Sequence, residues 1–151
     1  MANSSALCSS FKGELLTGTH NFGVGVVRAA TTADTFKAAL YLASGSLGAS
    51  TTAYSVTSEV SGTGYTAGGI TVTNATAPAV TTTQAYWTPS ASFAWTAVTL
   101  ATAFDTVLVY NSTQSNKAIS VHTFGSQTVT AGNFTLSMPA NGAGTGLVQI
   151  N

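Results

Sequence analysis

The chain has 151 residues, of which 44% are hydrophobic and only 5% are charged: four Lys or Arg and four Asp or Glu, with a formal net charge of zero. An ordinary soluble domain has charged side chains at about a quarter of its positions. This scarcity argues against an enzyme, which brings titratable groups together, and against a nucleic-acid-binding protein, which needs rows of Lys and Arg. The length suits one domain with a real core, and the aromatic content argues against disorder of the whole chain.

The first 22 residues differ from those that follow. Ser9 and Ser10 can cap a short helix that ends at Leu16, with Phe11 and Leu15 on one side of it. We therefore predict an N-terminal arm or short helix over residues 1–22, which reaches a neighbouring copy, and a single β-sandwich domain over residues 23–151. The sequence shows no signal-peptide pattern and no apolar window long enough to span a membrane, so we expect no membrane contact.

After residue 22 the pattern becomes that of β-strands. Residues 35–42 alternate, with Phe36 and Leu40 on the same side, which predicts a strand with one buried face. Further strands are predicted at residues 54–60, 69–73, 84–88, 95–100, 106–110, 118–124, 133–138 and 147–150. Residues 78–83 begin with Pro78 and are predicted to form an edge or a crossing. The predicted fold class is all-β, a jelly-roll-like antiparallel β-sandwich of about eight strands with a short N-terminal helix or arm.

The same alternation predicts the core. Residues 106–110 are apolar on both faces, which is typical of a central strand buried on both sides. The predicted core residues are Phe36, Leu40, Val72, Val98, Val107, Val109, Val121, Phe134 and Leu136.

The few titratable side chains do not form a recognisable site. His20 and His122 are the only histidines, and neither has carboxylates or further imidazoles close in the sequence, as a metal or acid–base site would require. Asp34 and Asp105 precede strands and Glu59 lies at a strand end, so we interpret them as turn residues or solvated charges. We predict no catalytic residue, no bound metal and no cofactor.

Other motifs have structural interpretations. Glu14 is expected to make a surface ion pair with Lys12 or Lys117, and Cys8 lacks the basic neighbours that would make it a nucleophile. Three glycine clusters lie at residues 23–25, 62–64 and 142–146. None of them ends in Gly-Lys-Ser/Thr or opens a helix after a strand, so we interpret them as loop glycines rather than phosphate-binding loops.

The aromatic residues leave one alternative open. Trp87, Trp95, Tyr86, Tyr54 and Tyr65 are candidates for a sugar-binding platform on a sandwich module. The competing interpretation is that they pack in the core or at a contact between subunits, where Trp and Tyr are also enriched. We favour the second interpretation and keep a carbohydrate- or receptor-binding module as the alternative.

Several segments, taken in order along most of the chain, resemble a group of virion proteins of tailed bacteriophages. The segments that carry the resemblance are SFKGELL (10–16), GTHNF (18–22), DTFKAALY (34–41), TTAYSVTSEVSGTGYTAGG (51–69), VLVYNST (107–113) and FTLSMPAN (134–141). None of these motifs carries catalytic chemistry.

The resemblance implies a head decoration (cement) protein with a jelly-roll-like β-sandwich on the capsid exterior. Such a protein would be made in the cytoplasm of the bacterial host and would bind the major capsid protein and copies of itself, as a dimer or trimer. It would contact neither nucleic acid nor membrane. A tail, head–tail or head-fibre position remains open.

Overall fold

The computed structural model of the protein describes residues 3–8, 10–11, 15, 19–20, 34–73, 76–82 and 84–150. Within these ranges the chain forms eight strands in two antiparallel sheets, one of five strands and one of three. The predicted all-β sandwich with about eight strands is therefore confirmed.

The larger sheet has the strand order β1-β7-β6-β2-β3. Its strands are β1 (Ala6–Leu7), β2 (Phe36–Leu42), β3 (Ile70–Thr71), β6 (Phe93–Asn111) and β7 (Lys117–Leu136). In the middle of the sheet, Leu40 of β2 pairs with Val107 of β6, which pairs with His122 of β7. The β-branched and aliphatic residues at the end of β6 favour this position, since they pack well on a pleated surface that is covered on both sides.

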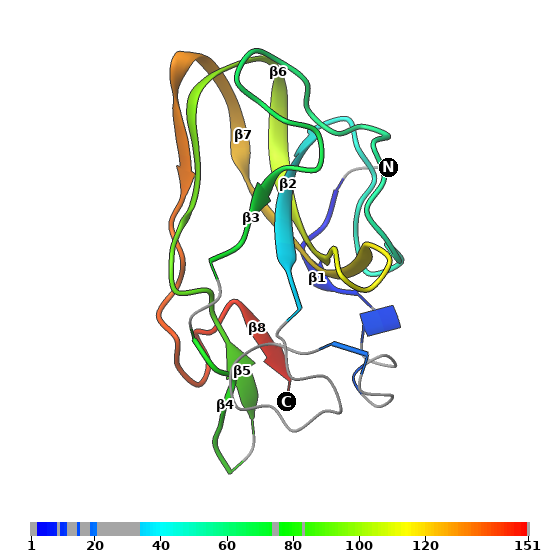
Figure 1. The fold of residues 1–151 in the computed structure, drawn as a ribbon, viewed down its shortest axis with the longest axis vertical. Helices are drawn as coiled ribbons and strands as arrows, with labels where there is room; N and C mark the ends of the chain where they lie inside the picture. The colour runs from blue at the N-terminus through cyan, green and yellow to red at the C-terminus, as the bar shows by residue number, and fades with distance from the viewer. Residues whose placement is uncertain are drawn as a thin grey trace.

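The hairpin of β6 and β7 is long enough to contribute to both layers of the sandwich. Phe124 and Phe134 are ten residues apart on β7, which is about 30 Å in a straight strand, yet their ring centroids lie 5.2 Å apart. The strand therefore folds back on itself, and Figure 1 shows the hairpin arching over at one end of the molecule. Register shifts between the two strands and the positive φ of Ala97 (52°) and Ala131 (46°) provide this bend.

The core lies between the two halves of this folded hairpin. Phe104 and Phe134 meet edge to face at 5.0 Å, and Trp95 lies 5.8 Å from Phe134. Of the nine predicted core residues, seven are buried, while Phe134 and Leu136 are partly buried and pack against the core. The core prediction is therefore confirmed, with these two residues at its margin.

A long loop over residues 43–69 covers the other face of β2. As a result Ala39 and Tyr41 are as buried as Leu40, and the prediction that β2 has only one buried face is wrong. The loop also closes one side of the sandwich, because the N–H of Val60 donates to the Leu40 carbonyl of β2 and the N–H of Thr99 of β6 donates to the Thr63 carbonyl.

The predicted strand at residues 54–60 does not form. This part of the loop makes only an isolated bridge, between Glu59 and Tyr41, and Ser58 has a positive φ of 63° that interrupts an extended conformation. The alternating pattern arises because Tyr54 and Val60 turn toward the sheet from an irregular loop, where both are packed on or within the core.

Four other segments that were predicted as separate strands belong to two long strands. Segments 95–100 and 106–110 are parts of β6, and segments 118–124 and 133–138 overlap β7. The residues between them form bulges and bends within a strand instead of turns between strands. The predicted strand at 69–73 is shortened to Ile70–Thr71.

The smaller sheet lies at the other end of the molecule from the arch (Figure 1). It has the order β4-β5-β8, formed by β4 (Ala79–Val80), β5 (Ala85–Trp87) and β8 (Val148–Ile150). These strands agree with the predicted segments, and β4 is an edge strand as Pro78 indicated. Trp87 joins this sheet to the larger one, since its ring lies 5.8 Å from that of Phe36 on β2.

The described residues near the N-terminus belong to the domain itself. Asn3 donates to the Leu42 carbonyl, and Cys8 and Phe11 are fully buried in the core. These residues therefore do not form an arm apart from the sandwich. Of the predicted helix at residues 9–16, Ser10, Phe11 and Leu15 have helical backbone, and the other residues of that segment lie outside the described ranges.

Candidate functional site

Every carboxylate in the described part of the chain is hydrogen-bonded by the protein itself. Asp105, in β6, accepts hydrogen bonds from Asn3 Nδ2 at 2.9 Å and from the Thr106 hydroxyl at 2.6 Å. The first of these bonds attaches the N-terminal segment to β6. Asp34 and Glu59 each organise a larger cluster. The interpretation of these acids as simple turn residues or solvated charges therefore missed their main role, which is to attach loops to strands.

Glu59 lies at the centre of a tyrosine cluster formed by Tyr41, Tyr54, Tyr65 and Tyr110. Its carboxylate accepts hydrogen bonds from the hydroxyls of Tyr54 (2.6 Å) and Tyr65 (2.8 Å) and from the backbone N–H of Gly68 (2.7 Å). The Tyr110 ring stacks on that of Tyr54 at 4.8 Å. This cluster contains four of the five tyrosines of the chain and connects the 43–69 loop to β2 and β6.

The other phenol groups of the cluster bond the backbone. The Tyr41 hydroxyl donates to the Ser55 carbonyl at 2.5 Å, and the Tyr110 hydroxyl donates to the Gly68 carbonyl at 2.8 Å. Burial, reinforced by the negative charge of Glu59, raises the pKa of Tyr110 to about 12 and raises the pKa of Tyr41 still further. All these groups are therefore protonated donors at neutral pH, and the cluster stabilises the loop without offering a reactive phenolate.

A second buried polar cluster joins His20, Asp34 and Asn111. Asn111 Nδ2 lies 2.8 Å from Asp34 Oδ2 and 3.0 Å from His20 Nδ1, and Asn111 is fully buried at the end of β6. Gln114 Nε2 donates to the other Asp34 oxygen at 3.2 Å. His20 and Asp34 were both considered as candidates in the sequence, but nothing in the sequence placed them together. Asn111, a polar residue at the end of an apolar strand, was the signal that could have located the cluster.

The hydrogen bonds of Asn111 define the protonation state of His20. Asn111 Oδ1 accepts from the backbone N–H groups of Thr113 and Gln114, both at 3.1 Å, so the amide orientation is fixed with Nδ2 toward the histidine. Because Nδ2 can only donate, His20 Nδ1 must accept, and the imidazole in this arrangement is neutral with its hydrogen on Nε2. Asn111 separates the imidazole from the carboxylate, so Asp34 does not orient His20 as the acid of a hydrolytic triad would.

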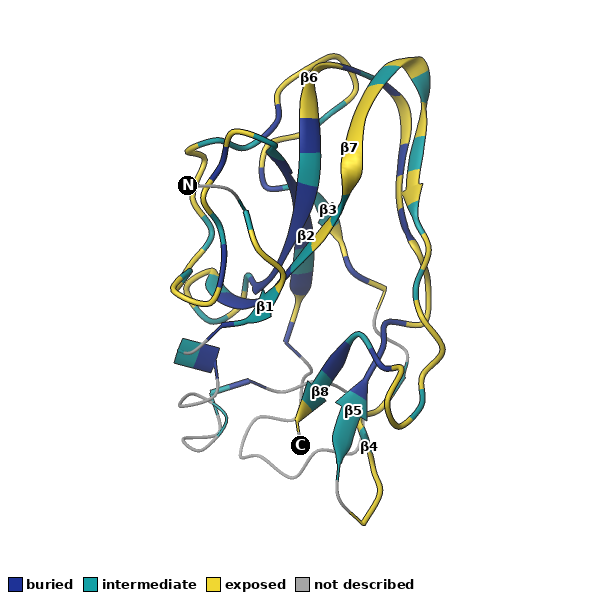
Figure 2. Ribbon diagram, turned by 180° about the vertical axis from the view of Figure 1, so that it is seen from behind, coloured by how far each residue is buried: buried dark blue, intermediate teal, exposed yellow. Residues whose placement is uncertain are grey.

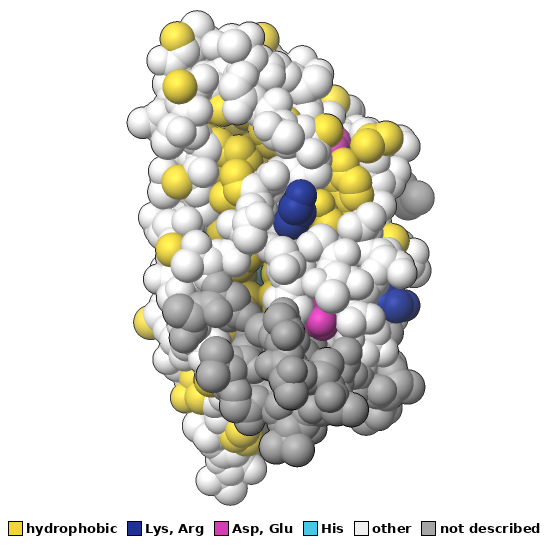
Figure 3. All heavy atoms as spheres, viewed as in Figure 1, with side chains coloured by type: hydrophobic (Ala, Val, Ile, Leu, Met, Phe, Trp, Pro, Cys, Tyr) yellow, Lys and Arg dark blue, Asp and Glu magenta, His cyan; other side chains and the backbone are white. Residues whose placement is uncertain are grey.

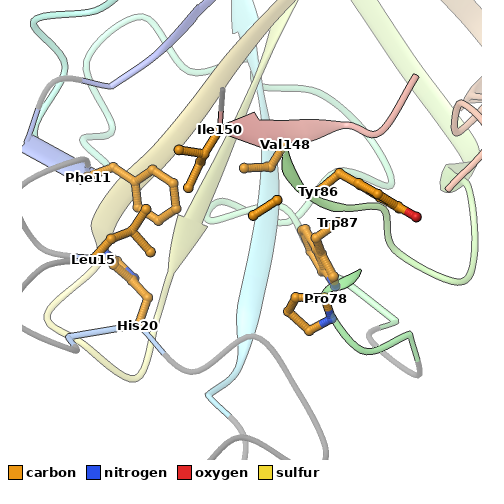
Figure 4. A pocket seen from close by; sticks show the side chains of 9 residues that line it. Phe11, Leu15, His20, Pro78, Tyr86, Trp87, Val148 and Ile150 are labelled. Carbon is orange, nitrogen blue, oxygen red and sulfur yellow. The ribbon is translucent and has the colours of Figure 1, made fainter. Parts of the chain in front are cut away.

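His20 also lies at the wall of a pocket of about 280 Å³ (Figure 4). The pocket opens between the N-terminal segment and one face of the smaller sheet. It is lined by Phe11, Leu15, His20, Pro78, Ala85, Tyr86, Trp87, Val148 and Ile150. Only three of these side chains carry polar atoms, and the Trp87 indole N–H is already donated to the Thr76 carbonyl at 3.1 Å.

This lining suits an apolar group better than a reacting substrate. None of the described lining residues has a carboxylate, a thiol or an aliphatic hydroxyl that could act as a nucleophile or as a general acid beside the imidazole. Among the described residues, no group of three or more His, Cys, Asp and Glu side chains could hold a metal ion. As far as the described residues show, the two polar clusters attach loops to strands, and the pocket has a mainly apolar lining.

The remaining candidates from the sequence occupy structural positions: the two tryptophans and Cys8 are buried, and His122 is partly buried. Trp87 and Trp95 are only 2% and 3% exposed, so neither provides an accessible platform for a sugar. His122 Nε2 lies 2.8 Å from the Ser120 hydroxyl, and burial lowers the pKa of His122 to about 4, so the ring is neutral at pH 7. Cys8 is fully buried. The predicted ion pair of Glu14 lies outside the described residues.

The glycine clusters within the described ranges are loop glycines, as expected. A Cβ on Gly62 would lie 2.0 Å from the Thr99 carbonyl oxygen, and one on Gly64, whose φ is 77°, would lie 2.4 Å from that of Ala97. These glycines therefore allow the 43–69 loop to approach β6 closely. The cluster at residues 23–25 is outside the described ranges.

No family model, curated protein or solved structure matches the chain. A search of the described residues for a helix long and apolar enough to cross the bilayer finds none.

Proposed function

We propose that this protein is a structural component of a bacteriophage virion, and specifically a cement protein that binds the outside of the head and stabilises neighbouring major capsid subunits. The observation that supports the proposal most directly is the low number of charged side chains on the surface. Charged residues are 5% of the chain, and each described carboxylate is used for an internal hydrogen bond. On the face shown in Figure 3, the charged side chains are few and lie apart from one another.

Such a surface suits close repetition of identical subunits. Many copies on a shell lie side by side, and a polar but uncharged surface avoids like-charge repulsion between them. Exposed Thr, Ser, Ala and Gly side chains are small and allow flat surfaces to approach. The absence of a basic patch among the described residues also favours a position away from packaged DNA, since binding to phosphates needs clustered Lys and Arg.

The sequence resemblance supports the same role. Its segments at residues 34–41, 51–69 and 107–113 are those that build β2, most of the closing loop and the end of β6, so the resemblance concerns the scaffold of the fold. The proposed role is non-catalytic, which agrees with the lack of an assembled nucleophile among the described residues of the two polar clusters and the pocket. The alternative of a carbohydrate-binding module is weakened, because Trp87 and Trp95 are buried and the hydroxyls of Tyr54 and Tyr65 are already donated to Glu59.

Cryo-electron microscopy of the phage that encodes the chain tests the proposal directly. We expect density for the sandwich on the outer surface of the head, at the junctions of capsid subunits. Density in the tail, in a head fibre or inside the shell would contradict the cement role. A second experiment compares heads with and without the protein and measures the temperature at which DNA is released.

Binding restricted to the assembled shell stabilises that shell by mass action, so heads that lack the protein should release DNA at a lower temperature. Adding purified protein back to these heads is the control and should restore the release temperature. Heads that release DNA at the same temperature with and without the protein would show that it decorates the shell without stabilising it.

A further inference from the structure

The outer part of β7 is the longest open edge in the described part of the molecule. β1 covers β7 only at Ser120 and Val121, and Ser5 extends this contact to Thr123 through hydrogen bonds of 2.6 Å. From Phe124 to Leu136, β7 pairs only with β6, and no other described strand or loop hydrogen-bonds to this stretch. We call it the free β7 edge. Figure 2 shows most of it in the colours of exposed and intermediate residues.

This edge lacks most of the features that protect sheet edges from pairing. It contains no Lys, Arg, Asp, Glu or Pro in 13 residues, whereas natural edges are commonly blocked by a charge, a proline or a very short strand. The other strands at sheet edges here have only two or three residues: β1, β3, β4 and β8. The edge does have one protective feature, because several register shifts against β6 and the positive φ of Ala131 bend it and divide it into short runs.

The chemistry of the edge fits a second copy of the same edge. Two identical strands related by a twofold axis pair in antiparallel fashion, and the interface is then the same surface patch on both subunits. Like charges directly opposite each other would oppose such pairing, and this edge has none. Its exposed side chains include Thr128, Thr130 and Thr135, and threonines that face each other across strands can hydrogen-bond. A partner with a charged edge would find no complementary charge here.

We propose that the free β7 edge, residues 124–136, pairs with the same edge of a second copy and joins two five-stranded sheets into one continuous sheet. The inference deepens the proposed structural role by naming the surface through which copies associate. It is tested on the isolated protein. Its failure would leave a cement role for the monomer intact, and a position of the protein elsewhere in the virion would leave the pairing intact.

The test places positive charge on the edge. In Thr128→Lys/Thr130→Lys, two exposed positions of β7 acquire positive charges, which lie close to those of the second copy in the paired state. The matched control, Thr57→Lys/Thr66→Lys, adds the same charge at exposed positions of the 43–69 loop. Sedimentation velocity over a range of concentrations gives the dimer dissociation constant of each. We expect the dimer dissociation constant of the edge variant to be at least tenfold higher than that of the wild type. The dissociation constant of the control should equal that of the wild type.

Two further measurements separate edge pairing from misfolding. Mixing the lysine variant with Thr128→Glu/Thr130→Glu should restore a dimer, because opposite charges then meet across the pair. Hydrogen exchange should slow at amides between Phe124 and Leu136 as protein concentration rises, and should not change in β3 or β4. A monomer at all concentrations, a dimer insensitive to the edge variant, or protection of the edge only on assembled capsids would overturn the proposal, the last in favour of a capsid protein as the strand partner.

Discussion

Replacing Gly69 with Ala tests whether close backbone approach fixes the 43–69 loop. Gly69 has a φ of 70°, and a Cβ at this position would lie 1.9 Å from the Ala38 carbonyl oxygen of β2. A left-handed conformation costs an alanine about 1–2 kcal/mol. The contact is with backbone, which cannot rotate away, and the shift it forces adds about 1–3 kcal/mol. We therefore expect the variant to lower the free energy of unfolding by about 2–5 kcal/mol.

Substitutions at three other glycines distinguish the conformational cost of a positive φ from the cost of the contact with backbone. Gly144 has a φ of 79° but open space around it, so Gly144→Ala should cost only the conformational part, about 1–2 kcal/mol. A Cβ on Gly62 would lie 2.0 Å from the Thr99 carbonyl oxygen without a positive φ, so Gly62→Ala should cost only the contact, about 1–3 kcal/mol. Gly125, in β7, has neither constraint, and Gly125→Ala should be neutral or stabilising by up to about 1 kcal/mol.

Urea unfolding followed by tryptophan fluorescence provides the measurement, because Trp87 and Trp95 are buried in the folded state. In thermal unfolding, each kcal/mol should shift the midpoint by about 2–4 °C for a chain of this size. The reasoning would be refuted if Gly69→Ala were no more destabilising than Gly144→Ala, or if Gly62→Ala were as mild as Gly125→Ala. Either result would mean that the loop can move away from the strands at no cost.

Glu59→Gln should lower the free energy of unfolding by about 1–3 kcal/mol in urea, because it replaces a charged acceptor of three hydrogen bonds; unchanged stability would contradict the role of the tyrosine cluster. The raised pKa of Tyr110, about 12, should leave stability unaffected below pH 10 and reduce it as the pH rises from 10 to 12, an effect that Tyr110→Phe should weaken. The lowered pKa of His122, about 4, should leave its contribution complete above pH 6.5 and remove it as the pH falls toward 4; His122→Gln should flatten this slope. Asn111→Ala should lower the free energy of unfolding in urea by about 1–3 kcal/mol, because it removes buried hydrogen bonds to Asp34 and His20, and by more than Gln114→Ala, which removes one bond to Asp34.

Local patterns predicted much of the fold. The alternation of residues 35–42 and the double-sided apolar run of 106–110 gave β2 and the end of β6, and turn residues marked β5 and β8 closely. What local patterns could not supply was the path of the long hairpin. Gly125 and Gly132 look like turn residues in the sequence, yet they lie within β7, where the strand bends and continues. Whether such a residue ends a strand or bends it depends on contacts with the other layer.

The polar clusters were less predictable, for a physical reason. Asp34 and Asn111 are far apart in the sequence and meet only because Phe36 at the start of β2 pairs with Asn111 at the end of β6. Glu59 reaches Tyr54 and Tyr65 locally, but its relation to Tyr110 depends on the loop lying across the sheet. Long-range register therefore determines both clusters, and a single sequence carries little information about register once bulges are present.

The segment from Glu59 to Gly69 shows why a strong sequence motif need not indicate chemistry. Glu59 anchors the segment through the Tyr65 hydroxyl and the Gly68 N–H, while Gly62 and Gly69 allow its backbone to lie against β6 and β2. Replacing Glu59 removes the acceptor and replacing Tyr65 removes a donor, while a side chain at Gly62 or Gly69 would occupy the space of a close approach, so structural closure alone accounts for these residues.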